Sequence, residues 1–191
     1  MNTLEAIRSR RSIRRFKPDP LPEDALREIL TAAILAPSGK NAQPWRFVVV
    51  REDKRTEMVD VMRAGIAARK AEGIPLGSSE WAAKVMQQAS VTVFVFNADE
   101  EAPFGPRNFG DVFGNRVDVQ SIGAAIQNML LAAQELGVGS LWICDIFYAY
   151  GEFCRWLEMP YQLIAAVSFG YADEAPTARP RKGLDEVTRW L

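Results

Sequence analysis

The segment from Val119 to Leu136 constrains the fold of this chain more than any other. Its apolar residues lie on almost every side of a helix with 3.6 residues per turn, instead of along one stripe. Gly137 follows it as the residue that ends helices in a left-handed conformation. We therefore expect a central helix with other elements packed around it. Its apolar positions are Ile122, Ile126, Met129, Leu130, Ala133 and Leu136.

Shorter helices and strands flank this helix in both directions. They alternate without the regular βαβ rhythm of a parallel sheet, which favours the α+β class. The length of 191 residues suits a single domain covering 1–191. Residues 97–114 hold two prolines and three glycines and are expected to be irregular. The expected helices are 2–11, 22–36, 53–71, 80–88, 119–136 and 150–157, and the expected strands are 47–50, 91–96, 141–143 and 163–169.

Charge, apolar run length and cysteine content each exclude a class of protein. Lys and Arg number 23 against 24 Asp and Glu, so the basic excess typical of nucleic-acid-binding proteins is missing. No run of roughly 18 uncharged apolar residues offers a membrane span. The Arg-rich first residues lack the apolar core of a secretory signal, so we expect a cytoplasmic protein. Two cysteines are too few for a disulfide framework or a zinc knuckle.

Histidine is absent from the sequence. Its absence excludes Ser-His-Asp and Cys-His nucleophilic catalysis and removes the commonest metal ligand. We therefore expect no metal site, and the chemistry must come from carboxylates, lysine, tyrosine or a cofactor. Of these, a cofactor is the leading possibility.

Two basic segments are candidates for binding an anion. Arg10–Arg15 follows the first helix, and Arg179–Lys182 lies in the polar tail, where Pro180 stiffens it. Guanidinium groups form bidentate, charge-assisted hydrogen bonds with phosphate and stay charged at any working pH. An isolated arginine cluster is more often a solvated surface, so the phosphate hypothesis requires the two segments to converge.

Two further segments carry polar groups at the ends of elements. The loop from Pro37 to Trp45 offers amides suited to the edge of a planar, uracil-like ring, although a plain helix-to-strand turn needs the same prolines and glycine. Asp145 follows a strand and is either a general acid or the N-cap of the next helix. Cys144, without a histidine partner, is interpreted as a small buried apolar residue. Gly137-Val138-Gly139 follows a helix, so it is not a dinucleotide-binding fingerprint.

Taken in order, these motifs resemble the FMN-dependent nitroreductase family. The opening of that family is similar to Arg10–Phe16 and Ala36–Phe47, and its central helix and next strand to Ile122–Ala133 and Gly137–Ile143. Its end is similar to Phe169-Gly170-Tyr171 and to the Arg179–Lys182 segment. Each motif has moderate specificity, but the ordered set spans essentially the whole chain.

The resemblance implies a mixed, mainly antiparallel sheet surrounded by helices, in an intertwined homodimer with FMN in two clefts between the subunits. The tail 172–191 would pack on the partner. Lys84 is the counterpart of a lysine that many relatives carry before the strand 91–96. The resemblance places Arg10, Ser12, Arg179 and Arg181 at the phosphate, with Arg11 in the same segment, and Arg14 nearer the ribityl chain and pyrimidine edge. It also places Pro37, Ser38 and Asn41 on the partner's flavin, and a backbone N–H of Cys144-Asp145 near flavin N5.

The activity implied by the resemblance is hydride transfer from NADH or NADPH through flavin N5 to a small acceptor such as a nitroaromatic or a quinone. The flavin carries the chemistry, so no catalytic side chain is expected, and one cleft serving donor and acceptor in turn gives ping-pong kinetics. The family also contains dehalogenases, azoline dehydrogenases and flavin-fragmenting enzymes. A flavin-binding protein without turnover is the alternative from another class. Relatives differ most in the segments 73–79 and 97–114, so the sequence does not identify the acceptor.

Overall fold

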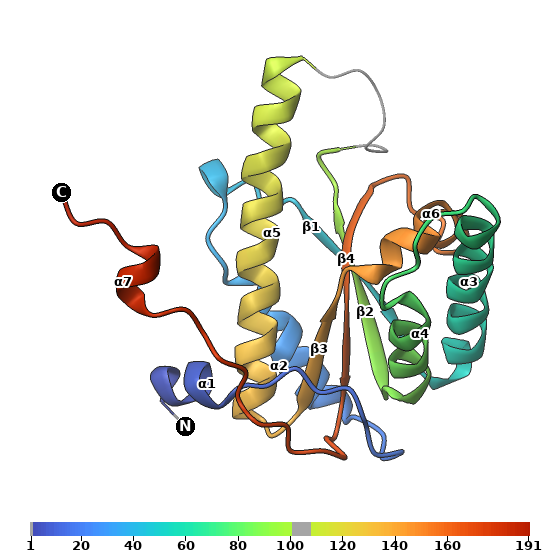
Figure 1. Cartoon of the computed structure of the whole chain (residues 1–191), viewed down its shortest axis with the longest axis horizontal. Coiled ribbons are helices and arrows are strands. Elements are labelled where there is room, and N and C mark those ends of the chain that lie inside the picture. Colours follow the sequence, from blue (N-terminus) through green and yellow to red (C-terminus); the bar gives the residue numbers. More distant parts are fainter. Residues whose placement is uncertain (1, 101–107) are drawn as a thin grey trace.

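A four-stranded sheet runs through the middle of the molecule (Figure 1). The structure is a computed structural model and describes residues 2–100 and 108–191. The strands are β1 (Trp45–Val50), β2 (Val91–Asn97), β3 (Gly139–Ile143) and β4 (Gln162–Gly170), in the order β1-β2-β4-β3. Each neighbouring pair is antiparallel. A parallel contact enters only as an isolated bridge between Ser12 and Ser140 in the described residues, so the mainly antiparallel sheet matches the expectation.

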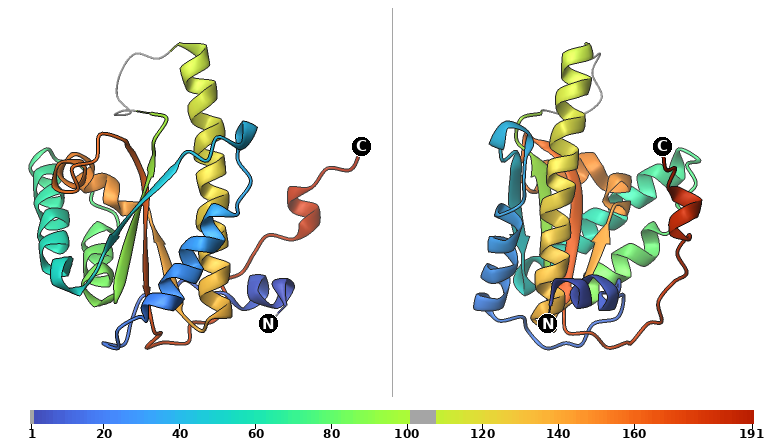
Figure 2. Two further views of the ribbon diagram at one scale, coloured as in Figure 1. Left: turned by 180° about the vertical axis from the view of Figure 1, so that it is seen from behind. Right: turned by 90° about the vertical axis from the view of Figure 1, so that its left-hand side faces the viewer.

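Helices cover both faces of this sheet (Figure 2). The α2 and α5 helices lie on one face, and α3, α4 and α6 lie on the other. Side chains alternate along β2, so Val93 and Val95 join the core under α2 and α5, and Phe94 joins the core on the other face. Because both faces are buried, the strands are continuous apolar runs. The helical elements are α1 (Thr3–Ser9), α2 (Glu23–Ile34), η1 (Gly39–Asn41), α3 (Glu52–Ala71), α4 (Ser79–Gln88), α5 (Phe109–Glu135), η2 (Asp145–Ala149), α6 (Tyr150–Trp156) and α7 (Leu184–Val187).

The α5 helix is the central helix that its composition predicts. Ile122, Ile126 and Met129 are completely buried, against α2 and the sheet. Gly137 has the left-handed φ of 70° expected of a helix-terminating glycine. Leu136 differs from the expectation, because it is the C-cap residue and is exposed to solvent.

The irregular structure expected for 97–114 is wrong for its last residues, because α5 begins at Phe109. The Asn108 side chain accepts from the Asp111 N–H at 3.1 Å, and the Asp111 carboxylate accepts from the Asn108 N–H at 3.1 Å. This reciprocal capping box offsets the weak helix propensity of the two glycines that follow. The first turns of α5 extend past the rest of the fold, and Phe109 is 86% exposed (Figure 1). Residues 101–107 of the segment lie outside the described part.

Gly65 allows α3 to pack directly on η2. A Cβ atom at this position would lie 2.3 Å from the Cβ and 2.4 Å from the Cα of Ala149. Replacing Gly65 by alanine is therefore expected to destabilise the protein by about 1–3 kcal/mol, the usual cost of overpacking a core. Thermal unfolding measures this effect, expected as a fall of several degrees in Tm.

The matched control is Gly114→Ala, also a glycine within a helix. Nothing lies within 4 Å of a Cβ at Gly114, so alanine there should stabilise α5 by up to about 1 kcal/mol. An equal Tm for Gly65→Ala and the wild type would show that α3 and η2 can move apart without loss of stability.

Candidate functional site: an arginine groove between the two ends of the chain

The segment after α1 is held in an extended conformation by two neighbours. On one side, the Ile13 N–H donates to the Ser140 carbonyl of β3 at 2.9 Å. On the other side, the Lys17 N–H donates to the Tyr171 carbonyl at 2.8 Å, directly after β4. Ile13 and Phe16 are buried in the core beneath this segment. The N-terminal basic segment is therefore fixed beside the start of the C-terminal tail.

The two basic segments line one groove of about 850 Å³, which we call the arginine groove. One wall comes from the end of α1 and the residues after it, and the other from 176–181 of the tail. The lining residues described include six arginines and no aspartate or glutamate. Its polar lining side chains include Arg8, Arg10, Arg11, Ser12, Arg14, Arg179 and Arg181.

Arg10 shows how closely the cations of the arginine groove approach one another. Burial lowers its pKa from the ordinary value, and the charges of Arg11 and Arg181 lower it further. The guanidinium of Arg10 thus lies near a cation 171 positions away in the sequence. Crowded like charges cost free energy that a bound anion would offset. The groove therefore suits a phosphate group.

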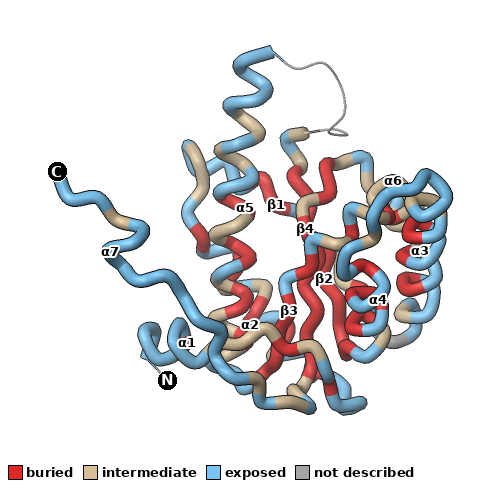
Figure 3. The backbone as a smooth tube through the Cα atoms, in the orientation of Figure 1, coloured by how far each residue is buried: buried red, intermediate tan, exposed pale blue. Residues whose placement is uncertain are grey.

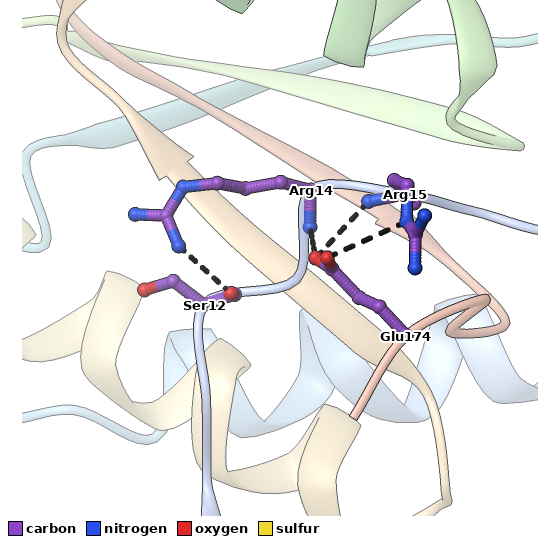
Figure 4. A network of polar contacts seen from close by, with 4 residues as sticks. All are labelled: Ser12, Arg14, Arg15 and Glu174. Atoms are coloured by element: carbon purple, nitrogen blue, oxygen red, sulfur yellow. Dashed lines mark hydrogen bonds and ion pairs between the residues drawn. The ribbon is translucent and has the colours of Figure 1, made fainter. Parts of the chain in front are cut away.

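Glu174 ties the tail to the N-terminal segment (Figure 4). Its carboxylate accepts from the backbone N–H groups of Arg14 and Arg15, and also forms an ion pair with the Arg15 side chain at 3.7 Å. The Arg14 side chain extends away from Glu174, toward Ser12. Glu174 thus leaves the Arg14 guanidinium unneutralised while it fixes the backbone that carries it.

Glu174→Ala is expected to lower the free energy of unfolding by about 1–3 kcal/mol, because the partly buried Arg14 N–H and the exposed Arg15 N–H lose their acceptor. Glu174→Gln should cost less, since its amide oxygen still accepts a hydrogen bond. Urea unfolding without added cofactor measures both. Glu28→Ala, on the exposed side of α2, is the control and should stay within about 0.5 kcal/mol of wild type. Identical free energies of unfolding for Glu174→Ala, Glu174→Gln and Glu28→Ala would mean that other contacts hold the tail.

The Arg14 guanidinium lies over the indole ring of Trp81 on α4. Its central carbon is 5.2 Å from the ring centroid, within the range of a cation–π interaction. One Arg14 nitrogen also donates to the Ser12 carbonyl at 3.0 Å. Trp81 is 44% exposed and was missed by the sequence reasoning. Its position three residues before the predicted Lys84, on the same helix face, was the available signal. Lys84 is exposed on α4.

Cys144 follows β3 and differs from its interpretation as a buried apolar residue, because it is exposed. Partial desolvation raises the pKa of its thiol, and the charge of Asp145 raises it further, against a hydrogen bond with Trp142 that lowers it. The thiol is therefore protonated at neutral pH and is a poor nucleophile.

Asp145 is not the N-cap of a helix, since it is the first residue within η2. Its carboxylate accepts from the Ser78 hydroxyl at 2.6 Å, and nearby the Tyr148 hydroxyl donates to the Pro75 carbonyl at 3.0 Å. Two hydrogen bonds thus attach the segment 73–79 to η2, on the same side of the sheet as Trp81.

The loop from Pro37 to Gln43 lies apart from the arginine groove of its own chain. It rests against α5, where the Gly39 N–H donates to the Ser121 hydroxyl at 3.2 Å. In Figure 2, η1 lies beside the N-terminal half of α5, and α1 lies beside the opposite end of that helix. Pro37 and Asn41 are exposed and Ser38 is half-buried, and none of the three lines the groove.

This loop also holds strained backbone. Lys40, Asn41 and Gln43 have φ values of 51°, 57° and 52°, a region that costs free energy for residues other than glycine. Strain of this kind persists where a particular presentation of backbone and side chains is required. The loop is therefore a second candidate binding surface, displayed away from the first.

The fold and the groove define a class: an α+β protein with a groove lined by arginines from both ends of its chain, as an anion site requires. The chain belongs to the nitroreductase family, whose model matches residues 7–171. The family expected from the sequence motifs, and its nitroreductase-like fold, are thereby confirmed.

Similar proteins cover nearly the whole chain. A protein of Methanothermobacter thermautotrophicus named "Putative NADH dehydrogenase/NAD(P)H nitroreductase" is 29% identical over 98% of this chain and 86% of its own length. The crystal structure of a "putative nitroreductase in complex with fmn" from Desulfovibrio desulfuricans is 30% identical, with a TM-score of 0.77 over 100% of this chain and 97% of that one. The FMN-dependent nitroreductase NfnB of Mycobacterium smegmatis, solved with NADPH, shares the fold at 22% identity and a TM-score of 0.74, over 98% and 97% of the two chains.

Two kinds of feature are absent from the described residues. No helix there is long and apolar enough to cross a membrane. In the same part of the chain, no three metal-ligating side chains are grouped so that they could hold a metal ion.

Proposed function

We propose that this protein is an FMN-dependent oxidoreductase that takes a hydride from NADH or NADPH and passes it to a small acceptor, such as a nitroaromatic or a quinone. The observation that carries the proposal is the arginine groove, in which the two basic segments meet in a chain of the nitroreductase family. FMN is bound in the crystal structure of the 30% identical Desulfovibrio desulfuricans protein. A reaction that uses NADH or NADPH also fits the cytoplasmic location expected from the sequence.

The residues of the groove fit the phosphate end of FMN. Arg10, Arg179 and Arg181 supply charge-assisted donors, and Ser12 supplies a hydroxyl, with no carboxylate among the lining residues. Arg14, held by Trp81, would reach the ribityl chain and the pyrimidine edge. FMN, when bound, supplies hydride transfer through its N5 atom.

The chain's own contribution is to bind, orient and stabilise charge. Arg14 is a fixed cation whose guanidinium keeps free donors, which suits a ring edge that gains negative charge on reduction. The neutral Cys144 thiol and the absence of histidine leave the residues after β3 without a strong nucleophile or base. Backbone N–H groups of Cys144 and Asp145 remain as donors for the cofactor. The side chains thus bind and position the reactants without forming covalent intermediates.

We also propose that two copies of the chain form the functional unit. The tail leaves the body of the protomer, and its last apolar residues are exposed; Trp190 is 76% accessible (Figure 3). Leu184, Val187 and Leu191 are exposed as well. A partner subunit would cover this arm. The same arrangement would bring the strained Pro37–Asn41 loop to the partner's cofactor.

The first test is the colour and chemistry of the purified protein. It is expected to be yellow and to release FMN on heating or acidification, because the groove offers several arginine donors to a terminal phosphate. Mass spectrometry and absorbance identify the released flavin. FAD, riboflavin, or a colourless protein that cannot be reconstituted would contradict the proposal.

Anaerobic addition of NADH or NADPH separates the enzyme from its alternative. Rapid bleaching of the bound flavin, followed by reoxidation with a quinone or nitroaromatic, is expected of the oxidoreductase. A flavin that stays oxidised with both donors would favour a flavin-binding protein without this turnover.

A further inference from the structure

The arginine groove carries more positive charge than one flavin phosphate needs. Six guanidinium groups line it, whereas a phosphate monoester carries about −1.5 to −2 charges at neutral pH. An FMN phosphate and the diphosphate of a nicotinamide dinucleotide together bring about four negative charges. A further phosphate monoester, such as the 2′-phosphate of NADPH, raises this total to about six.

Most of these arginines already have a partner or a role. Arg10, Arg179 and Arg181 are those proposed for the flavin phosphate, and Arg14 lies on Trp81. Arg11 donates from one nitrogen to the carbonyls of Arg8 and Arg10, at 2.7 and 2.9 Å, and so closes the end of α1.

Arg8 is the cation that remains. It lies in the last turn of α1, is exposed, and lines the groove. Within residues 2–100 and 108–191, its guanidinium has no carboxylate at ion-pair distance. Its donors are therefore free for a ligand, on the helix that precedes the segment carrying the proposed flavin contacts.

We propose that Arg8 binds the 2′-phosphate of NADPH and so makes the enzyme prefer NADPH to NADH. The inference rests on the proposed function, because a donor that shares the cofactor site would meet the arginine groove at the phosphate end of that site. NADH and NADPH differ only in the 2′-phosphate, so a free guanidinium at this place discriminates between them. Burial lowers the pKa of Arg10 most, and the nearby charges of Arg11 and Arg181 lower it further; this closeness of three cations is a second sign that the groove suits several negative charges.

The test uses the FMN-loaded protein and two fragments of the donors, adenosine 2′,5′-bisphosphate and 5′-AMP. In isothermal titration, the wild type is expected to bind the bisphosphate at least about tenfold more tightly than 5′-AMP. Arg8→Gln should weaken the bisphosphate by about 10- to 100-fold, the effect of one charge-assisted hydrogen bond, and should leave 5′-AMP and FMN content unchanged. The ratio of kcat/KM for NADPH to that for NADH should fall by a similar factor.

Lys17→Gln is the matched control, since it removes one positive charge from the same end of the molecule at an exposed side chain outside the groove. It should change none of these quantities by more than about twofold. The assignment of Arg8 would be overturned if Arg8→Gln and Lys17→Gln lost equal affinity for the bisphosphate. An unchanged ratio of kcat/KM for NADPH to that for NADH in Arg8→Gln would overturn it as well. A protein that does not bind FMN at all would instead overturn the proposed function, so the two failures are distinguishable.

Discussion

Replacing Arg10 and Arg181 together by alanine is expected to weaken FMN binding by about two decades or more. Each guanidinium contributes a charge-assisted hydrogen bond worth ~1.5–3 kcal/mol, so each single variant should lose about one to two decades. The two side chains are close enough for Arg181 to lower the pKa of Arg10. Neighbouring residues couple, so the double loss should differ from the sum of the single losses. Fluorescence titration of the apoprotein with FMN measures all three affinities.

The control for this prediction is Arg63→Ala, an exposed arginine on α3, away from the groove. Its affinity for FMN should equal that of the wild type. The groove variants should also melt at lower temperature in limiting FMN and recover in excess FMN, because ligand binding stabilises the folded state by mass action. Wild-type affinity in both single variants would show that the phosphate lies elsewhere.

Co-expressing two chains, each weak in flavin-dependent turnover, is expected to restore activity if each cofactor site is shared between subunits. Arg10→Ala damages the arginine groove, and Asn41→Ala damages the loop that we propose reaches the partner's site. In a heterodimer of the two, both lesions fall in one site and the other site is intact. Random pairing makes about half of the dimers mixed, so about a quarter of all sites should be intact.

Turnover at low FMN, measured on co-expressed and separately tagged chains, tests this expectation. The control is co-expression of Arg10→Ala with Arg181→Ala, two lesions that lie in one groove of the same chain. That pair leaves each site with one lesion and should show no recovery. Failure of the first pair to exceed its parents, or a flavin-loaded monomer in sedimentation, would refute the shared site.

The local elements were largely predictable because their residues report burial directly. The strand predicted at 163–169 is observed as Gln162–Gly170, and the one predicted at 91–96 as Val91–Asn97, since continuous β-branched and aromatic runs have few alternatives. The start of α5 was mispredicted because glycine and proline counts outweighed a capping box between Asn108 and Asp111. Element boundaries of this kind depend on single hydrogen bonds.

The contacts of the site were less predictable than its cations. The arginine motifs were identified in both basic segments, but Glu174 was not, because no local pattern relates it to Arg14 across 160 positions. Trp81 was missed for another reason, because an indole on a helix is usually a core residue. Cys144 was placed inside the protein because cysteines are commonly buried, whereas its position just after an edge strand exposes it.

The junction between Glu174 and the Arg14–Arg15 backbone also sets when the arginine groove can form during synthesis. The ribosome makes the chain from the N-terminus at roughly 5–20 residues per second, so Arg14 emerges long before Glu174. Until then the arginines after α1 have neither their backbone clamp nor Arg179 and Arg181. Closing a loop of this length costs conformational entropy that only the late contacts repay. The arginine groove is therefore completed only after the tail has emerged.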